Sequence, residues 1–129
     1  MIFLKIIAIN YNICVEMIKE LTYKEKRSEF ISLLFDCKSI VDANKIIAEV
    51  KKKHYKAKHV LACLNLKNTN LAKEDGEPIK SMHLLLEYMN RNAIFEKLVV
   101  IVRYYGGVNL GQNRLSKVYY NQGVEILEN

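Results

Sequence analysis

The sequence predicts an α+β fold, a two-layer β-α-β sandwich in which helices pack against a sheet. The chain has 129 residues, half of them hydrophobic, which is enough for one domain with a real core. Short apolar runs typical of strands alternate with segments whose apolar residues recur at helical spacing. Loop-forming residues and the only proline gather between these segments. The predicted order of elements is therefore β-α-β-α-β-α.

The first strand is predicted from Ser28 to Asp36, a row rich in Phe, Ile and Leu. Ser39, followed three residues later by Asp42, resembles a capping box and predicts the start of a helix. The apolar residues that recur there at helical spacing are Ile40, Ala43, Ile46, Ile47 and Val50. We expect this helix to fray in the basic tail from Lys51 to His59.

The middle of the chain predicts a strand, a loop and a helix. The strand is expected from His59 to Leu66, and the loop from Asn68 to Pro78. Ser81 is expected to cap the helix that follows. The residues expected to face inward on that helix are Leu84, Leu85, Tyr88 and Met89.

The clearest strand runs from Lys97 to Tyr104. We expect it in the middle of the sheet, because residues 99–102 form an uninterrupted apolar run that suits a strand covered on both faces. A glycine loop follows, and Gln112 to Glu128 predicts the last helix. Its expected inward residues are Leu115, Val118, Tyr119 and Gln122.

Residues 1–16 are expected to be an N-terminal extension with one or two extra strands, or a mis-assigned start, because a second methionine is residue 17. Residues 17–129 are expected to form a single domain. The N-terminus lacks the cleavage site of a signal peptide, and no apolar stretch is long enough to cross a membrane. We therefore expect a cytoplasmic protein without a membrane partner.

The cysteines predict neither a disulfide framework nor a zinc knuckle. Cys14, Cys37 and Cys63 are odd in number, isolated and without C-x-x-C spacing. We expect them to be small buried apolar residues in a reducing compartment.

The chain is basic, with 20 Lys and Arg against 14 Asp and Glu, a net charge of +6 and a pI of about 9.2. This charge allows nucleic acid, ribosome or acidic protein surfaces as partners without requiring them. Five lysines fall within eight positions: Lys51, Lys52, Lys53, Lys56 and Lys58. They fit a phosphate-contacting patch, and they equally fit a solvated helix end.

An acidic loop stands out in this basic chain. It runs from Glu74 to Pro78 and carries three carboxylates within four positions. These carboxylates can bind Mg²⁺, receive Arg or Lys from another segment, or lie on a solvated turn. We expect Asp75 or Glu77 to lie within salt-bridge reach of Arg103.

A second loop, R-Y-Y-G-G-V-N-L-G from Arg103 to Gly111, leaves a strand and enters a helix. Its backbone N–H groups and the helix N-terminus can hold an anion, with Arg103 gripping a phosphate and Tyr104 or Tyr105 stacking on a base. The alternative is a tight turn that needs glycine only for its backbone. The sequence matches neither a Walker loop nor a G-x-G-x-x-G fingerprint.

Catalytic templates are absent from the sequence. His54, His59 and His83 are scattered, so no zinc pair at helical spacing exists, and there is no G-x-S-x-G elbow. No catalytic residue is therefore assigned, and the metal question stays open. The domain is expected to bind rather than catalyse.

Four segments, taken in order, resemble the YigZ/IMPACT family. They are K-R-S-E-F-I (26–31), K-A-K-H-V-L-A (56–62), E-D-G-E-P (74–78) and V-V-I-V-R-Y-Y-G-G-V-N-L-G (99–111). The resemblance covers about residues 24 to 120. It implies a fold of the class seen in domain IV of elongation factor G, with the two signature loops lining one face. The ligand-binding positions that it implies are His59, Asp75, Gly76, Glu77, Pro78, Arg103, Tyr104, Gly106, Gly107, Leu110 and Gly111.

The sequence departs from the family pattern after each signature loop. Met82, His83, Asn113 and Arg114 stand where the family usually has small residues. Bulkier side chains there are expected to crowd any cleft. Bacterial relatives also carry a C-terminal ferredoxin-like domain, which we expect this chain to lack.

The favoured function is a non-enzymatic regulatory or binding module connected with translation, docking to protein or RNA. Eukaryotic members of the family inhibit the kinase that senses uncharged tRNA, so this expectation rests on the resemblance. The alternative is an enzyme or ligand-binding protein that uses the two loops for a phosphate-bearing substrate with Mg²⁺. A third possibility is a relative that has kept the fold and lost the site. No cofactor and no DNA sequence specificity are expected, and the oligomeric state is left open.

Overall fold

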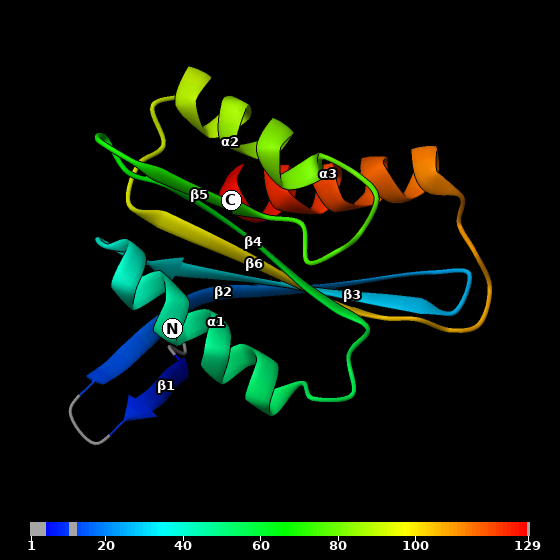
Figure 1. Ribbon diagram of the computed structural model, residues 1–129, viewed down its shortest axis with the longest axis horizontal. Helices are drawn as coiled ribbons and strands as arrows, with labels where there is room; N and C mark the ends of the chain where they lie inside the picture. The colour runs from blue at the N-terminus through cyan, green and yellow to red at the C-terminus, as the bar shows by residue number, and fades with distance from the viewer. Residues whose placement is uncertain (1–4, 11–12, 129) are drawn as a thin grey trace.

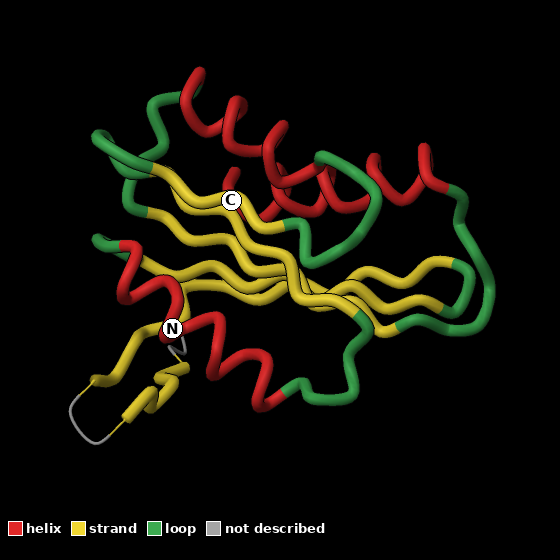
Figure 2. The backbone as a smooth tube through the Cα atoms, viewed as in Figure 1, coloured by secondary structure: helices red, strands yellow, loops and turns green. Residues whose placement is uncertain are grey.

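The computed structural model describes the backbone of residues 5–10 and 13–128, with side chains from residue 16 onward. Its strands are β1 (Lys5–Asn10), β2 (Ile13–Glu25), β3 (Ser28–Asp36), β4 (His59–Asn65), β5 (Asn70–Lys73) and β6 (Lys97–Tyr104). Its helices are α1 (Ile40–Lys53), α2 (Ser81–Arg91) and α3 (Gln112–Glu128). Within the described residues the strands form one antiparallel sheet in the order β1-β2-β3-β6-β4-β5 (Figures 1 and 2).

Helices occupy both faces of the sheet, as Figure 1 shows. Helix α1 packs on one face, where Ala43, Ile46 and Val50 meet alternate residues of the strands. Helices α2 and α3 cover the other face with a second apolar cluster that includes Leu85 and Tyr119. The predicted α+β class is confirmed. No helix among the described residues is long and apolar enough to cross a membrane.

Strand β6 lies between β3 and β4, which confirms the prediction that it is central. Val99, Val100, Ile101 and Val102 are all fully buried. They alternate between the two apolar clusters, so both faces of the strand need apolar side chains. This explains the uninterrupted apolar run in the sequence.

The helix starts were predicted with mixed success. Ser39 caps α1 as predicted, because its hydroxyl accepts a hydrogen bond of 3.1 Å from the backbone N–H of Asp42. The capping role assigned to Ser81 is wrong: this residue is the first of α2, and its hydroxyl bonds to Ser116. Leu84, predicted to face inward, is 45% exposed, because the buried face of α2 runs through Met82, Leu85 and Met89.

The loop predicted from Asn68 to Pro78 contains a strand, so this part of the prediction is wrong. Among the described strands, β5 pairs only with β4, along the edge of the sheet. Its side chains are half-buried or exposed, so the segment carries no apolar pattern that would predict a strand. Cys37 and Cys63 are free and buried, as expected, whereas the side chain of Cys14 lies outside the described residues.

One glycine allows the loop after β6 to pack against the hairpin between β2 and β3. A Cβ atom on Gly106 would lie 2.0 Å from the backbone oxygen of Arg27. Only a residue without a side chain fits at this distance. The hairpin thus helps to position the loop that leads into α3.

Candidate functional site

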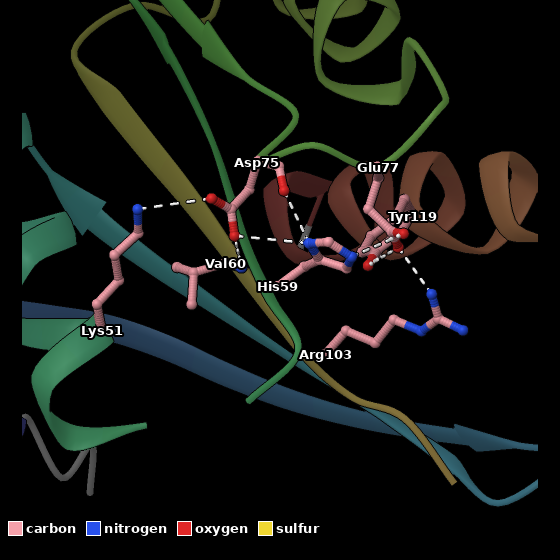
Figure 3. A network of polar contacts seen from close by, with 7 residues as sticks. All are labelled: Lys51, His59, Val60, Asp75, Glu77, Arg103 and Tyr119. Atoms are coloured by element: carbon pink, nitrogen blue, oxygen red, sulfur yellow. Dashed lines mark hydrogen bonds and ion pairs between the residues drawn. The ribbon is translucent and has the colours of Figure 1, made fainter. Parts of the chain in front are cut away.

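A buried polar network lies at the end of the sheet where β4 begins and β6 ends (Figure 3). We call it the Glu77 network, and its members are His59, Glu77, Arg103 and Tyr119. The antiparallel register pairs His59 of β4 with Arg103 of β6. Helix α3 supplies Tyr119, and the loop between β5 and α2 supplies Glu77. Two strands and one helix therefore converge on the carboxylate of Glu77.

Glu77 and Arg103 form a buried ion pair. The Nη1 atom of Arg103 lies 2.8 Å from Oε2 of Glu77, and both side chains are only 4% exposed. The predicted contact between the acidic loop and Arg103 is confirmed. Removing either partner would leave an unpaired charge inside the protein, so the two residues depend on each other.

Tyr119 completes the coordination of the same carboxylate oxygen. Its hydroxyl donates a hydrogen bond of 2.6 Å to Oε2 of Glu77. Burial, and then this hydrogen bond to a carboxylate, raise the pKa of Tyr119 far above its usual value. The tyrosine therefore acts as a permanent hydrogen-bond donor, not as an acid.

His59 joins Glu77 to the turn that precedes it. Its Nδ1 lies 2.7 Å from the backbone oxygen of Asp75, and its Nε2 lies 3.1 Å from Oε1 of Glu77. Because a carbonyl oxygen only accepts, Nδ1 carries a proton in this arrangement. The histidine thereby fixes the distance between β4 and the acidic loop.

The acidic loop begins with a tight turn. Asp75 and Gly76 both have positive φ, and the N–H of Glu77 donates to the carbonyl of Glu74 at 3.0 Å, as in a type I′ turn. One carboxylate oxygen of Asp75 accepts from the N–H of Val60 at 2.7 Å, and the other lies 3.6 Å from Nζ of Lys51. The turn therefore links β4 to the end of α1 (Figure 3).

Glu74 replaces the cap that the sequence suggested for α2. Its carboxylate accepts hydrogen bonds from the backbone N–H groups of Met82 and His83, at 3.0 and 3.1 Å, and from Nδ1 of His83 at 2.7 Å. A carboxylate at a helix N-terminus accepts hydrogen bonds from backbone N–H groups that have no partner within the helix. Its negative charge also interacts favourably with the positive end of the helix dipole.

All three carboxylates of the loop therefore bind protein donors. Among the described residues, no group of three His, Cys, Asp or Glu side chains is arranged to hold a metal ion. The Mg²⁺ site stays a prediction.

The five predicted lysines lie at the end of α1 and in the segment before β4. All five are exposed. Two of them, Lys51 and Lys58, line a pocket of about 230 Å³ together with His54 and Tyr55. Tyr55 is 76% exposed. The basic segment, defined here as residues 51–58, thus presents cations together with an open aromatic ring.

A second pocket, of about 350 Å³, lies beside the Glu77 network at the start of α3. Predicted site residues that line it are Glu77, Pro78, Arg103, Leu110 and Gly111. Lys58 lines both pockets and so connects them. We call this second pocket the α3 pocket.

Some predicted site residues lie elsewhere. Tyr104 contacts the α1 cluster, and its hydroxyl lies 2.7 Å from Nδ1 of His54. Gly76, Gly106 and Gly107 shape the loops without lining the α3 pocket. The four bulky replacements do not line it either, so the expected crowding is not found there. Met82 is buried in the core, His83 contacts Glu74, Arg114 pairs with Glu25, and Asn113 is exposed.

Tyr119, Asn109 and Gln112 are site residues that the sequence did not single out. Tyr119 was predicted only as an inward residue of the last helix. A tyrosine on a buried helix face needs a partner for its hydroxyl, and this is the signal that could have identified it.

The chain is similar to known proteins of one family. The family model described as "Impact N-terminal domain" matches residues 26–127. An IMPACT family member of Haemophilus influenzae is 31% identical over 112 residues, covering 80% of this chain and 54% of that protein. The IMPACT family member YvyE of Bacillus subtilis is 29% identical over 98 residues, covering 73% of this chain and 45% of that protein.

A solved structure shares the fold. The crystal structure of a hypothetical protein superposes with a TM-score of 0.78 at 25% identity, over 84% of this chain and 55% of that one. The chain thus spans about half the length of the curated relatives it matches. Because the family model covers most of the chain, including both signature loops, the chain belongs to the IMPACT family through its Impact N-terminal domain.

Proposed function

We propose that this domain is a non-enzymatic module that acts in the cytoplasm and is connected with translation. It binds single-stranded RNA through the basic segment. Membership of the IMPACT family supports a regulatory or binding module. The RNA partner is our extension of that statement.

The observation that carries the proposal is the composition of the basic segment. It has five exposed lysines and an exposed tyrosine ring, and two of the lysines, Lys51 and Lys58, line a pocket of about 230 Å³ together with this ring. Lysines neutralise phosphates, and aromatic rings stack on unpaired bases whatever their sequence. Tyr105, the residue directly after β6, adds a second ring, and Nζ of Lys58 lies 4.2 Å from the centroid of this ring. A duplex offers no free base faces, so a single strand fits this surface better.

The Glu77 network supports binding over catalysis. Its carboxylate accepts hydrogen bonds from Arg103 and Tyr119 and lies 3.1 Å from Nε2 of His59, and its tyrosine stays protonated. General acid–base chemistry needs a group that exchanges a proton with substrate near neutral pH. The network instead fixes the loops on which Arg103 and the acidic turn lie.

Salt dependence of RNA binding tests the proposal. Affinity for a single-stranded RNA of about 12 nucleotides, a length typical of one small binding domain, would be measured by fluorescence anisotropy at several salt concentrations. Each lysine that neutralises a phosphate contributes about 0.7–0.9 to the slope of log K against log salt. Replacing Lys51, Lys52 and Lys53 together by Ala is expected to flatten the slope by roughly two to three units.

The matched control replaces three exposed lysines outside the basic segment, Lys67, Lys80 and Lys117, by Ala. It makes the same change in net charge and is expected to leave most of the slope intact. Equal slopes for the two triple variants, with both folded by circular dichroism, would refute the proposal. So would tighter binding of an RNA duplex than of the single strand.

A further inference from the structure

The α3 pocket is lined by an arginine that has one N–H donor left unused by the fold. Arg103 lines the pocket, its side chain is 96% buried, and its Nε–H has no acceptor in the described part of the chain. A buried guanidinium donor without a partner costs free energy, so the fold leaves part of the hydrogen-bonding capacity of Arg103 unused.

Lys58 adds a second cation to the same pocket. Its backbone N–H donates to the carbonyl of Arg103 at 2.8 Å, which keeps the two residues together. The ring of Tyr105 lies against both: Nζ of Lys58 is 4.2 Å and Cζ of Arg103 is 5.5 Å from its centroid. The tyrosine hydroxyl in turn donates to Asn109, another residue of the pocket wall, at 2.9 Å.

Glu77 also lines the pocket, and its charge opposes that of Arg103. This carboxylate is already met by the Arg103 guanidinium, the Tyr119 hydroxyl and the His59 ring. With the negative charge of Glu77 set against Arg103, Lys58 is the remaining cation of the wall. An anion that enters therefore meets an excess of positive charge.

The start of α3 also favours the binding of an anion in this pocket. Gly111 and Gln112 line the pocket, and the first turn of the helix carries no acidic residue. The first N–H groups of a helix lack partners within the helix and attract anions. The volume of about 350 Å³ lies at the lower end of the range for small-molecule sites, roughly 300–1,000 Å³. A phosphate with an attached nucleoside falls within this size.

We propose that the α3 pocket binds a phosphate monoester, contacted by Arg103, Lys58 and the N-terminus of α3. Because Lys58 also lines the pocket of the basic segment, the favoured source is the 5′-terminal phosphate of an RNA lying along that segment. This choice of source rests on the proposed function, whereas the phosphate chemistry of the pocket does not. Free phosphate is the other source of the same chemistry.

The test compares two RNAs of identical sequence that carry either a 5′-phosphate or a 5′-hydroxyl. The unmodified protein is expected to prefer the 5′-phosphate by about tenfold, the contribution of one charge-assisted hydrogen bond. Lys58→Ala is expected to abolish the preference. Lys56→Ala is the matched control, because Lys56 is exposed, lies two residues away and lines neither pocket.

A second arm measures thermal stabilisation by inorganic phosphate, with the same two variants. If phosphate stabilises the unmodified protein and Lys56→Ala but not Lys58→Ala, the result would support phosphate binding in the α3 pocket, with free phosphate as the source. General salt effects would instead act on all three proteins alike. This outcome stands even where no RNA binds, in which case the proposed function fails and the pocket survives. RNA binding without a 5′-phosphate preference, together with no phosphate stabilisation that depends on Lys58, would overturn the inference and leave the proposed function standing.

Discussion

Glu77 is the residue whose carboxylate holds together the acidic loop, two strands and one helix. It receives an arginine, a tyrosine and a histidine while being only 4% exposed. A buried charge is tolerated only when its partners satisfy it. The family motif around this residue is therefore explained as architecture, and the same contacts leave Arg103 at the wall of the α3 pocket.

Replacing Glu77 by Ala is expected to lower the free energy of unfolding by about 3–5 kcal/mol, because it leaves the Arg103 charge and the Tyr119 hydroxyl buried without their partner. Urea denaturation followed by circular dichroism measures this. The control is Asp36→Ala, which removes the exposed ion pair with Lys97 and is expected to cost less than about 1 kcal/mol. Equal losses in the two variants would contradict the buried pair.

Cys63 gives a pH prediction of defined sign. Burial, and to a lesser degree Glu74, raise the pKa of Cys63 from 9.0 to about 12. The folded state therefore holds the thiol proton more tightly than the unfolded state. The resulting stability is fully present below pH 9 and is lost as pH rises from 9 to about 12, by up to about 1.4 kcal/mol per pH unit.

The measurement is the free energy of unfolding at pH 8 and pH 10, for the unmodified protein and for Cys63→Ala. Other groups also titrate in this range, so only the difference between the two proteins reports on the thiol. The unmodified protein should lose more stability than the variant between these pH values. Parallel pH profiles would show that the thiol titrates normally.

The pairing of Glu77 or Asp75 with Arg103 could be predicted because few charged residues of the sequence lie at the ends of motifs. The convergence of His59 and Tyr119 on the same carboxylate could not. It depends on the register between β4 and β6 and on the packing of α3, which bring together residues distant in the chain, such as Glu77 and Tyr119, 42 positions apart. No local pattern carries that information.

At the scale of elements, strands and helices with a strong apolar pattern were predicted well, whereas the strand at the exposed edge of the sheet was not. The bounds of β3, β6 and α3 agree with those expected from the sequence, because each buries a regular set of side chains. Strand β5 was missed because it forms through backbone pairing at the sheet edge, with half-exposed side chains. The cap of α2 was misplaced because Glu74 reaches the helix from outside any local window.

Glu74→Ala is expected to destabilise the protein by about 1 kcal/mol, the usual cost of losing a side chain that accepts from the first N–H groups of a helix. The control is Glu87→Ala, an exposed carboxylate on the same helix beyond its first turn. Thermal and urea unfolding of both variants measure the difference. A loss no greater than that of the control would show that α2 begins without help from Glu74.

At the scale of the whole molecule, the sheet separates two apolar clusters, and the site lies at the end of the sheet where β6 ends and β4 begins. Strand β6 borders both clusters and pairs with a strand on each side. Arg103 lies in this strand, and the loop that follows it directly carries Leu110 and Gly111, which line the α3 pocket. The most protected strand of the fold therefore carries the residues of the site.

Hydrogen exchange should reflect this arrangement. Amides of Leu98 to Val102 are expected to exchange only through global unfolding, because the strand is buried on both faces and paired on both edges. Amides of β5, which pairs on one edge, are expected to exchange through smaller openings.

Exchange measured residue by residue in low concentrations of urea distinguishes the two kinds of opening, since only global unfolding shows the full urea dependence. Equal protection and equal urea dependence of β5 and β6 would contradict the layered reading. The expected result would mean that Arg103 keeps its position until the whole domain unfolds, so that ligand binding at the α3 pocket requires no ordering of the strand that carries it.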